Sequence, residues 1–149
     1  MSQTILLVED NSSDEKLTRV AFKNCGVSNN VVVVRDGAAA LDYLFATGEY
    51  SERDAAVLPR LVLLDIKLPK IDGLEVLRRL RADPHTQLVP VVILTSSKQD
   101  EDVLRGYELG ANAYVRKPVE FAEFAAAAKT VGLFWLLLNE PAPVHKETQ

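Results

Sequence analysis

Hydrophobic residues gather in five short runs, separated by longer segments in which apolar and polar residues mix. The runs are ILLV (5–8), VVVV (31–34), LVLL (61–64), VVIL (91–94) and the weaker AYV (113–115). The first four are continuous rather than alternating, which is typical of strands in a sheet that is covered on both faces. The pattern therefore predicts five short strands, at least four of them buried.

The segments between these runs carry apolar residues at helical spacing. Each follows a polar or small residue that is suited to begin a helix. The candidates are Ser13, Asp36 or Gly37, Asp72, Asp100 and Glu120. Alternation of strand and helix predicts an α/β fold with a doubly wound parallel sheet and right-handed crossovers. For five strands in 149 residues, we expect a single domain with the flavodoxin-like strand order 2-1-3-4-5. The domain is expected over residues 1–140, with a disordered, proline-containing tail over 141–149.

Composition narrows the classes of partner. Seventeen basic against twenty-one acidic side chains give a net charge of −4, without the basic footprint of a nucleic-acid binder. A lone Cys25 builds neither an internal disulfide nor a thiolate zinc site. The most apolar stretch, TVGLFWLLLN (130–139), is shorter than the roughly 20 residues of a membrane span. We therefore expect a cytoplasmic protein that binds neither nucleic acid nor membrane.

Chemistry-bearing residues follow the predicted strands. Glu9 and Asp10 come after the first strand, Asp65 after the third, Thr95 at the end of the fourth and Lys117 after the fifth. The carboxyl ends of parallel strands form the ligand-binding edge of such a sheet, so these side chains should converge. Three neighbouring carboxylates repel one another unless a hard cation such as Mg²⁺ lies among them. With a lysine and a hydroxyl added, the group suits phosphoryl transfer, and Asp65 is the predicted nucleophile.

Each residue also has a structural interpretation. An acid at a strand end is often a helix cap or a solvated loop residue, a lone Thr95 is often structural, and Lys117-Pro118 is a common turn. Their occurrence together after neighbouring strands favours the site.

Four motifs occur in one order along the chain: ILLVEDN, LVLLDIKLPKIDGLEVLRRLR, VVILTSS and AYVRKP. In this order and spacing the chain resembles the receiver domain of two-component response regulators, over about residues 3–138. The resemblance implies a protein that is phosphorylated by a histidine kinase and has no catalytic activity beyond its own phosphorylation and dephosphorylation.

The resemblance also implies a role for particular residues. Asp65 would be the phosphoacceptor, Asp10 and Glu9 would bind Mg²⁺ with the backbone carbonyl of Lys67, and Lys117 would pair with the phosphoryl group. Thr95 and Tyr114 would be the switch residues, and the bond before Pro118 would be cis. Phosphorylation would then change the surface made by the helix after Asp100, the strand at 113–115 and the last helix.

Two segments resemble a subgroup of this family. They are the long connection TGEYSERDAAVLPR (47–60) and the ending VGLFWLLLNEP (131–141). Together they are similar to the small response regulators of phytochrome-type histidine kinases in bacteria, which implies a bilin-binding photoreceptor as the partner.

The last predicted helix is apolar around its whole circumference between 133 and 138, although a helix on a sheet needs only one apolar stripe. Large exposed apolar patches usually mark interfaces. We therefore predict a homodimer through this helix and its neighbours at 100–107 and 113–115. The interface residues would be Phe134, Trp135, Leu137 and Leu138.

Lys67 stands two residues after Asp65, and Ser97 stands two residues after Thr95. In receiver domains, the side chains at these two positions flank the path by which the hydrolytic water approaches the phosphoryl group. A lysine lying over the phosphoryl group would block that water and slow self-dephosphorylation. The alternative is that Lys67 points to solvent. Arg78, Arg79 and Arg81 are expected on the solvated face of a helix.

Other functions remain as alternatives. An aspartyl-phosphate hydrolase usually has a second acid where this chain has Lys67, and the acids of EDNSSDE (9–15) would repel the phosphate of a flavin. A transcription factor would need a DNA-binding domain after the last helix. An unphosphorylated dimer scaffold and a phosphorelay shuttle for a non-phytochrome kinase stay open.

Overall fold

The sheet has the predicted topology. A computed structural model describes residues 4–24, 30–97, 99–117, 120–135, 139–140 and 142–143. The strands are β1 (Ile5–Val8), β2 (Val31–Val34), β3 (Leu61–Leu64), β4 (Val91–Thr95) and β5 (Ala113–Arg116). All pair in parallel, in the order β2-β1-β3-β4-β5. This confirms the flavodoxin-like fold, and β4 and β5 each extend one residue beyond the predicted run.

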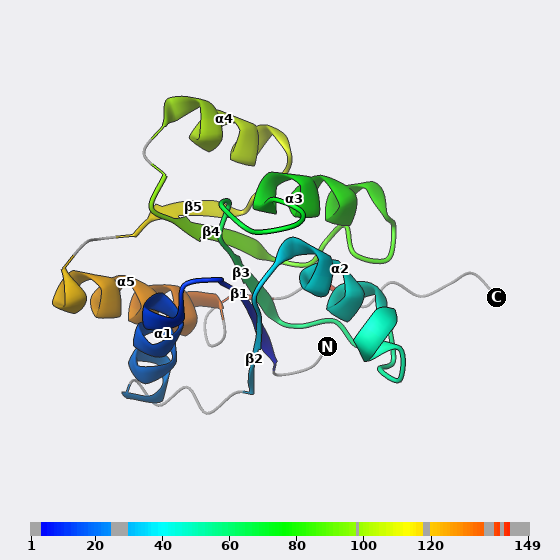
Figure 1. Cartoon of the computed structure of the whole chain (residues 1–149), viewed down its shortest axis with the longest axis horizontal. Helices are drawn as coiled ribbons and strands as arrows, with labels where there is room; N and C mark the ends of the chain where they lie inside the picture. The colour runs from blue at the N-terminus through cyan, green and yellow to red at the C-terminus, as the bar shows by residue number, and fades with distance from the viewer. Residues whose placement is uncertain are drawn as a thin grey trace.

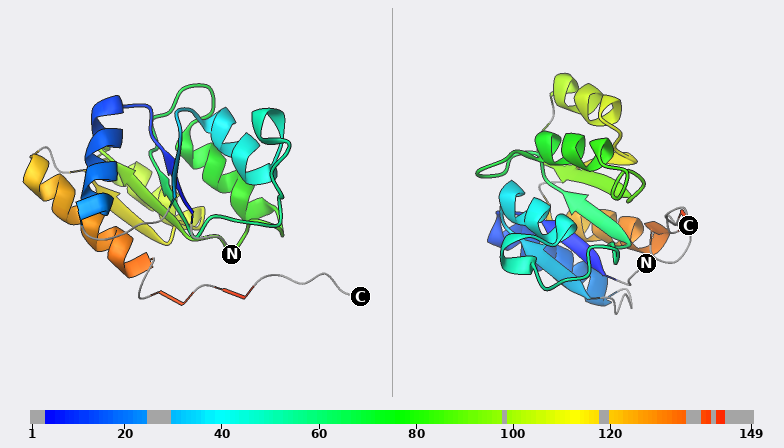
Figure 2. Two further views of the ribbon diagram at one scale, coloured as in Figure 1. Left: turned by 90° about the horizontal axis from the view of Figure 1, so that it is seen from below. Right: turned by 90° about the vertical axis from the view of Figure 1, so that its right-hand side faces the viewer.

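Helices cover both faces of the sheet. They are α1 (Ser12–Asn24), α2 (Gly37–Phe45), α3 (Gly73–Ala82), α4 (Asp100–Glu108) and α5 (Phe121–Leu133), with a short 3-10 helix η1 (Gly48–Tyr50). Helices α1 and α5 lie side by side on one face, while α2, α3 and α4 lie on the other (Figure 1). The turned views show the same layers (Figure 2). Among the described residues, no helix is long and apolar enough to cross a membrane.

Alternate residues of each central strand serve opposite cores. In β1, Leu6 and Val8 face the core under α2 and α3, whereas Ile5 and Leu7 face the core under α1 and α5. All four side chains are at most 2% exposed. Burial on both faces is the physical reason why the strand sequences are continuously apolar.

Side-chain caps fix the beginnings of three helices. The carboxylates of Asp36 and Asp72 accept from the N–H groups of Ala39 and Glu75, as predicted for α2 and α3. The prediction that Ser13 begins the first helix is wrong. Asn11 accepts from the Asp14 N–H at 3.0 Å, so α1 starts at Ser12. Asp14 in the first turn of α1 thereby lies within reach of Lys117, which follows β5.

The arginines of α3 do not share one environment. Arg78 and Arg79 pair with Glu75 on the exposed surface. Arg81 corrects the expectation of a solvated run, because it donates to the carbonyl oxygens of Gly110 at 2.9 Å and Val89 at 2.8 Å. Arg81 therefore joins α3 to the loops that precede β4 and β5, at the amino edge of the sheet.

Candidate functional site

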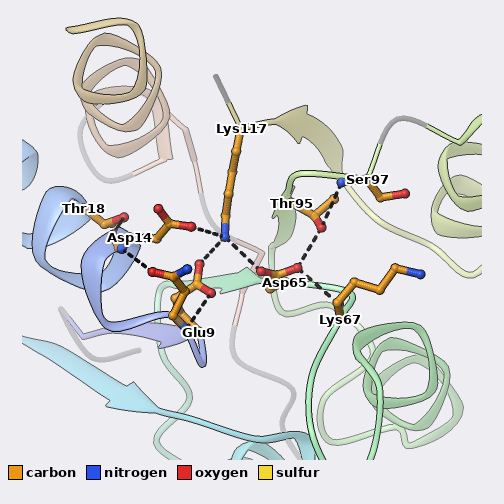
Figure 3. A network of polar contacts seen from close by, with 9 residues as sticks. Glu9, Asp14, Thr18, Asp65, Lys67, Thr95, Ser97 and Lys117 are labelled. Carbon is orange, nitrogen blue, oxygen red and sulfur yellow. Dashed lines mark hydrogen bonds and ion pairs between the residues drawn. The ribbon is translucent and has the colours of Figure 1, made fainter. Parts of the chain in front are cut away.

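Polar side chains converge at the carboxyl edge of the sheet. Glu9 follows β1, Asp65 follows β3, Thr95 ends β4 and Lys117 follows β5, and Figure 3 shows them pointing toward one another. Glu9, Asp65 and Thr95 are 2%, 7% and 0% exposed, while Asp10 is exposed. The predicted convergence of strand ends thus places four side chains in one buried network, with Asp10 at its open side.

Both oxygens of the Asp65 carboxylate have donors. Its Oδ1 accepts from the Thr95 hydroxyl at 2.7 Å and from the Lys67 backbone N–H at 3.2 Å. Its Oδ2 accepts from the Lys117 ammonium at 2.9 Å. Burial raises the pKa of Asp65, but the Lys117 ammonium together with Thr95 and the Lys67 N–H lowers it by more, to below its usual value. Asp65 is therefore ionised, as a carboxylate nucleophile must be.

Lys117 is the cation at the centre of the network. Its side chain is 6% exposed, and its ammonium contacts carboxylates of Glu9, Asp14 and Asp65. Burial lowers the pKa of Lys117, yet hydrogen bonds and charge from Glu9 and Asp65 outweigh burial and raise it. Lys117 is charged, which compensates part of the negative charge buried around it.

The pKa of Glu9 is shifted in the opposite direction to that of Asp65. Burial raises the pKa of Glu9 to about 7, with Lys117 acting in the opposite direction and the Asp65 charge adding to the rise. Its Oε2 accepts from the Asn11 N–H at 3.2 Å. Glu9 thus lies at the site, and burial disfavours its charged form unless a further cation is bound beside it.

Three acids are placed to hold a divalent cation. One carboxylate oxygen each from Glu9, Asp10 and Asp65 lies within 4.8 Å of the others. A set of carboxylate oxygens suits a hard ion. An open cavity of about 380 Å³ extends from Asp10 past the β3–α3 loop to Asp102 of α4. The donor set therefore fits a divalent metal, and the site is accessible from solvent.

The β4–α4 loop connects this network to α4. The Ser97 N–H lies 3.4 Å from the Thr95 hydroxyl oxygen, and the Ser97 hydroxyl donates to the Asp102 carboxylate. Lys67 Nζ lies 3.9 Å from the same carboxylate oxygen. In this structure Lys67 therefore reaches along the cavity toward α4, although 67% of its side chain is exposed.

Tyr114 of β5 is half-buried beneath α4. Its hydroxyl donates to the Ser97 carbonyl at 3.5 Å, and burial raises its pKa. A Cβ on Gly106 of α4 would lie 2.9 Å from Ile93 Cδ1 and 3.2 Å from the Tyr114 ring, so a larger residue there would displace these side chains. The Tyr114 ring therefore packs directly against α4 at Gly106.

Asp14 is a residue of this network that the sequence interpretation missed. Its carboxylate contacts the Lys117 ammonium at 2.9 Å. The available signal was its place four residues after Asp10, in the first turn of a helix that begins at the carboxyl edge. Acids are common in the first turn of a helix, so this position alone did not indicate a contact with Lys117.

Some predicted site residues lie outside the described part of the chain: Pro118, with its predicted cis bond, and the interface residues Leu137 and Leu138. Phe134 is 46% exposed and its ring meets Trp135 edge-on at 5.1 Å. Trp135 packs against the core under α1 and α5. Of the two described interface candidates, Phe134 is therefore the more exposed, and Trp135 is partly buried.

A family model for the response regulator receiver domain matches residues 5–129, most of the chain and every element that builds the site. The chain belongs to the response regulator receiver family. This match confirms the family membership predicted from the four motifs. Receiver domains are the phosphoryl-accepting modules of two-component signalling.

Two relatives match this receiver over most of both chains. The "probable methanogenesis regulatory protein FilR2" of Methanothrix harundinacea is 40% identical over 93% of this chain and 88% of its own length. Response regulator Rcp1 of Synechocystis is 37% identical over 90% of this chain and 89% of its own.

Solved structures agree in fold. The phosphorylated cyanobacterial phytochrome response regulator RcpA has a TM-score of 0.88 and 38% identity, covering 96% of this receiver and all of its own chain (100%). The Mn²⁺-bound form of Rcp1 has a TM-score of 0.88 and 35% identity, covering 95% and 99%. This receiver is thus similar to single-domain response regulators of phytochromes.

Proposed function

We propose that this receiver accepts a phosphoryl group from a histidine kinase on Asp65, in a reaction that requires Mg²⁺. One observation carries the proposal: a buried, ionised carboxylate lies between a hydroxyl donor and an ammonium, beside two further acids. This set matches the needs of phosphoryl transfer, in which positioning and charge stabilisation supply most of the catalysis.

The chemistry is a displacement at phosphorus. An Asp65 oxygen forms the new P–O bond while the P–N bond to the kinase phosphohistidine breaks, and its electron pair leaves with the imidazole, which takes up a proton. Thr95 and Lys117 are placed to donate to phosphoryl oxygens once Asp65 carries the group. Water later attacks the acyl phosphate, so the chain acts only on its own phosphoryl group.

Glu9, Asp10 and Asp65, with the backbone carbonyl of Lys67, would hold the Mg²⁺ ion. When bound, Mg²⁺ neutralises charge on the phosphoryl oxygens. Support comes from the cluster of acids and from the Mn²⁺-bound form of the similar protein Rcp1.

The output would be a change in the surface of α4, β5 and α5. The added charge on Asp65 draws the Thr95 hydroxyl, and the Ser97 loop and Tyr114 follow through their contacts. Replacing Tyr114 by Ala should leave phosphorylation intact and weaken the output, measured as loss of the phosphorylation-induced change in amide hydrogen exchange of α4. An unchanged response of α4 would contradict the switch role.

A phytochrome-type kinase is the proposed donor, supported by the similarity to RcpA. FilR2 is similar to this receiver at comparable identity, but its name refers to methanogenesis and not to a phytochrome. The identity of the donor kinase therefore needs a direct test. A purified bilin-binding kinase should transfer phosphate to this receiver faster than to Asp65→Asn, with light-dependent rate. Transfer from unrelated kinases alone would point to a shuttle for a different system.

We also propose a homodimer through α4, β5 and α5, supported by the exposed rings at Phe134 and Tyr107 and by the apolar sequence at 133–138. Such an interface would be two-fold symmetric. Sedimentation at micromolar concentration should show dimer in one phosphorylation state at least. Monomer in both states would contradict it.

The proposal is tested by intact mass after incubation with acetyl phosphate, with and without Mg²⁺. Wild type should gain one phosphoryl group only with Mg²⁺, and Asp65→Asn should gain none. Glu75→Gln is a matched control, since it also neutralises one acid that accepts three hydrogen bonds. No gain from acetyl phosphate or from the kinase would leave the unphosphorylated scaffold as the better account.

A further inference from the structure

The Lys117 ammonium has as many carboxylate partners as it has N–H groups. Glu9 and Asp65 lie at the ends of β1 and β3, and Asp14 comes from the first turn of α1 (Figure 3). A buried ammonium is stable only when its three donors are satisfied. Asp14 thus completes the coordination of a side chain that is 6% exposed.

The partners differ in their relation to the metal. Glu9 and Asp65 belong to the three-acid cluster together with Asp10, whereas Asp14 does not. A divalent ion would draw oxygens of Glu9 and Asp65 toward itself and away from Lys117. Asp14 is therefore the carboxylate that can retain its hydrogen bond with the Lys117 ammonium when the ion is bound.

Asp14 is itself held in place. Its N–H donates to the Asn11 side chain at 3.0 Å, and its carbonyl accepts from the Thr18 hydroxyl at 2.8 Å. Thr18 is 1% exposed. The helix start therefore fixes the backbone from which the carboxylate reaches Lys117, while 26% of the Asp14 side chain stays in contact with solvent.

We propose that Asp14 is a positioning residue for phosphoryl transfer, which acts by holding the Lys117 ammonium against the place where the phosphoryl oxygens arrive. The inference rests on the proposed function of Asp65. A lysine has four carbons of flexible stem, and an unanchored ammonium would sample positions that do not face the phosphoryl group. Even a small displacement of a catalytic group lowers the reaction rate substantially. Asp14 acts through Lys117 and does not touch the reacting atoms.

The test is the rate of mass gain with acetyl phosphate at saturating Mg²⁺, in which the new bond is Asp65 O–P and acetate leaves. Asp14→Ala should slow the reaction about tenfold. Asp14→Asn removes the same charge but keeps an oxygen that accepts from Lys117, so its rate should stay within about threefold of wild type. Equal rates for Asp14→Ala and Asp14→Asn would overturn the proposal, because charge alone would then explain the effect.

Glu15→Ala is the matched control. Glu15 is the next acid in the first turn of α1, and its carboxylate pairs with Arg19 and Arg35. It loses the same charge from the same helix end, and it should react at the wild-type rate. Slowing equal to that of Asp14→Ala would assign the effect to helix α1 and overturn the proposal.

A double-mutant cycle tests whether Asp14 acts through Lys117. In a Lys117→Ala background, Asp14→Ala should cause no further loss of rate, and a further tenfold loss would overturn the proposal. Circular dichroism checks that each variant is folded. If wild type gains no phosphoryl group, the proposed function fails and this inference fails with it. If wild type reacts and Asp14→Ala keeps its rate, only the role of Asp14 fails.

Discussion

Two carboxylates in this receiver accept three hydrogen bonds each, and they do so for different reasons. Glu75 on α3 accepts from Arg78 at 2.8 and 2.6 Å and from Arg79 at 2.9 Å. Asp65 accepts from Thr95, Lys67 and Lys117 at 2.7 to 3.2 Å. The bond lengths are alike, but Glu75 finds its donors three and four residues along one helix, whereas Thr95 and Lys117 lie 30 and 52 positions from Asp65.

Solvent makes the two groups unequal. The side chains of the Glu75 group are 32 to 54% exposed, whereas those of Asp65 and Lys117 are 8% and 6% exposed. Hydrogen bonds from Arg78 and then Arg79 lower the pKa of Glu75 to about 2. Even so, exposed pairs on a helix contribute little to stability. The comparison teaches that a lowered carboxylate pKa points to a functional site where donors from distant elements produce it against the opposing effect of burial.

The largest expected effect is loss of the buried cation. Lys117→Met leaves Glu9 and Asp65 buried without their ammonium, so the free energy of unfolding should fall by about 3 kcal/mol. Urea denaturation without metal measures it. Arg79→Met, which removes a cation from Glu75, is the control and should change stability by less than about 0.5 kcal/mol. Equal losses of stability in Lys117→Met and Arg79→Met would contradict the distinction between the buried Asp65 group and the exposed Glu75 group.

Metal should stabilise the carboxyl edge and not α3. At 100 times its Kd, Mg²⁺ should raise the free energy of unfolding by about 2.7 kcal/mol, and a chelator should reverse the gain. The gain should be lost in Asp10→Asn and kept in Glu75→Gln, as thermal denaturation with and without Mg²⁺ would show. A gain that survives in Asp10→Asn would remove Asp10 from the metal site.

The Lys67 side chain belongs to neither group, although its backbone N–H donates to Asp65, and the effect of replacing this side chain should be kinetic. With phosphoryl charge on Asp65, its ammonium can leave Asp102, 3.9 Å away, and cover the phosphoryl group. Lys67→Asn should shorten the half-life of phospho-Asp65 by about threefold, the rate equivalent of a solvent-exposed ion pair. Radiolabelled phosphate release measures it. A half-life equal to that of wild type would mean that Lys67 stays with solvent or Asp102.

The smallest effect should come from Glu75 itself. Glu75→Gln should change the free energy of unfolding by less than about 0.5 kcal/mol and leave phosphorylation unchanged. Urea denaturation at low and at moderate salt checks this. A loss above 1 kcal/mol would show that hydrogen-bond geometry outweighs exposure.

Periodicity predicted the sheet because β1, β3 and β4 need apolar side chains on both faces, which leaves a visible signature. The strand-end residues followed from topology alone. Asp14 and Arg81 could not be found this way: each depends on where a helix begins or on which loop lies beneath it. Such features are set by individual hydrogen bonds, from the Asp14 N–H to Asn11 and from Arg81 to carbonyls such as that of Gly110, and not by a repeating pattern.

The central claim, that Asp65 is the phosphoacceptor, is tested most directly by locating the phosphoryl group chemically. Borohydride reduces an aspartyl phosphate to homoserine, and peptide mass spectrometry then identifies the position. After reaction with acetyl phosphate and Mg²⁺, we predict homoserine at position 65 alone, and none in protein reacted without Mg²⁺. Homoserine at Asp10 or Asp14 with Asp65 unmodified would contradict the account.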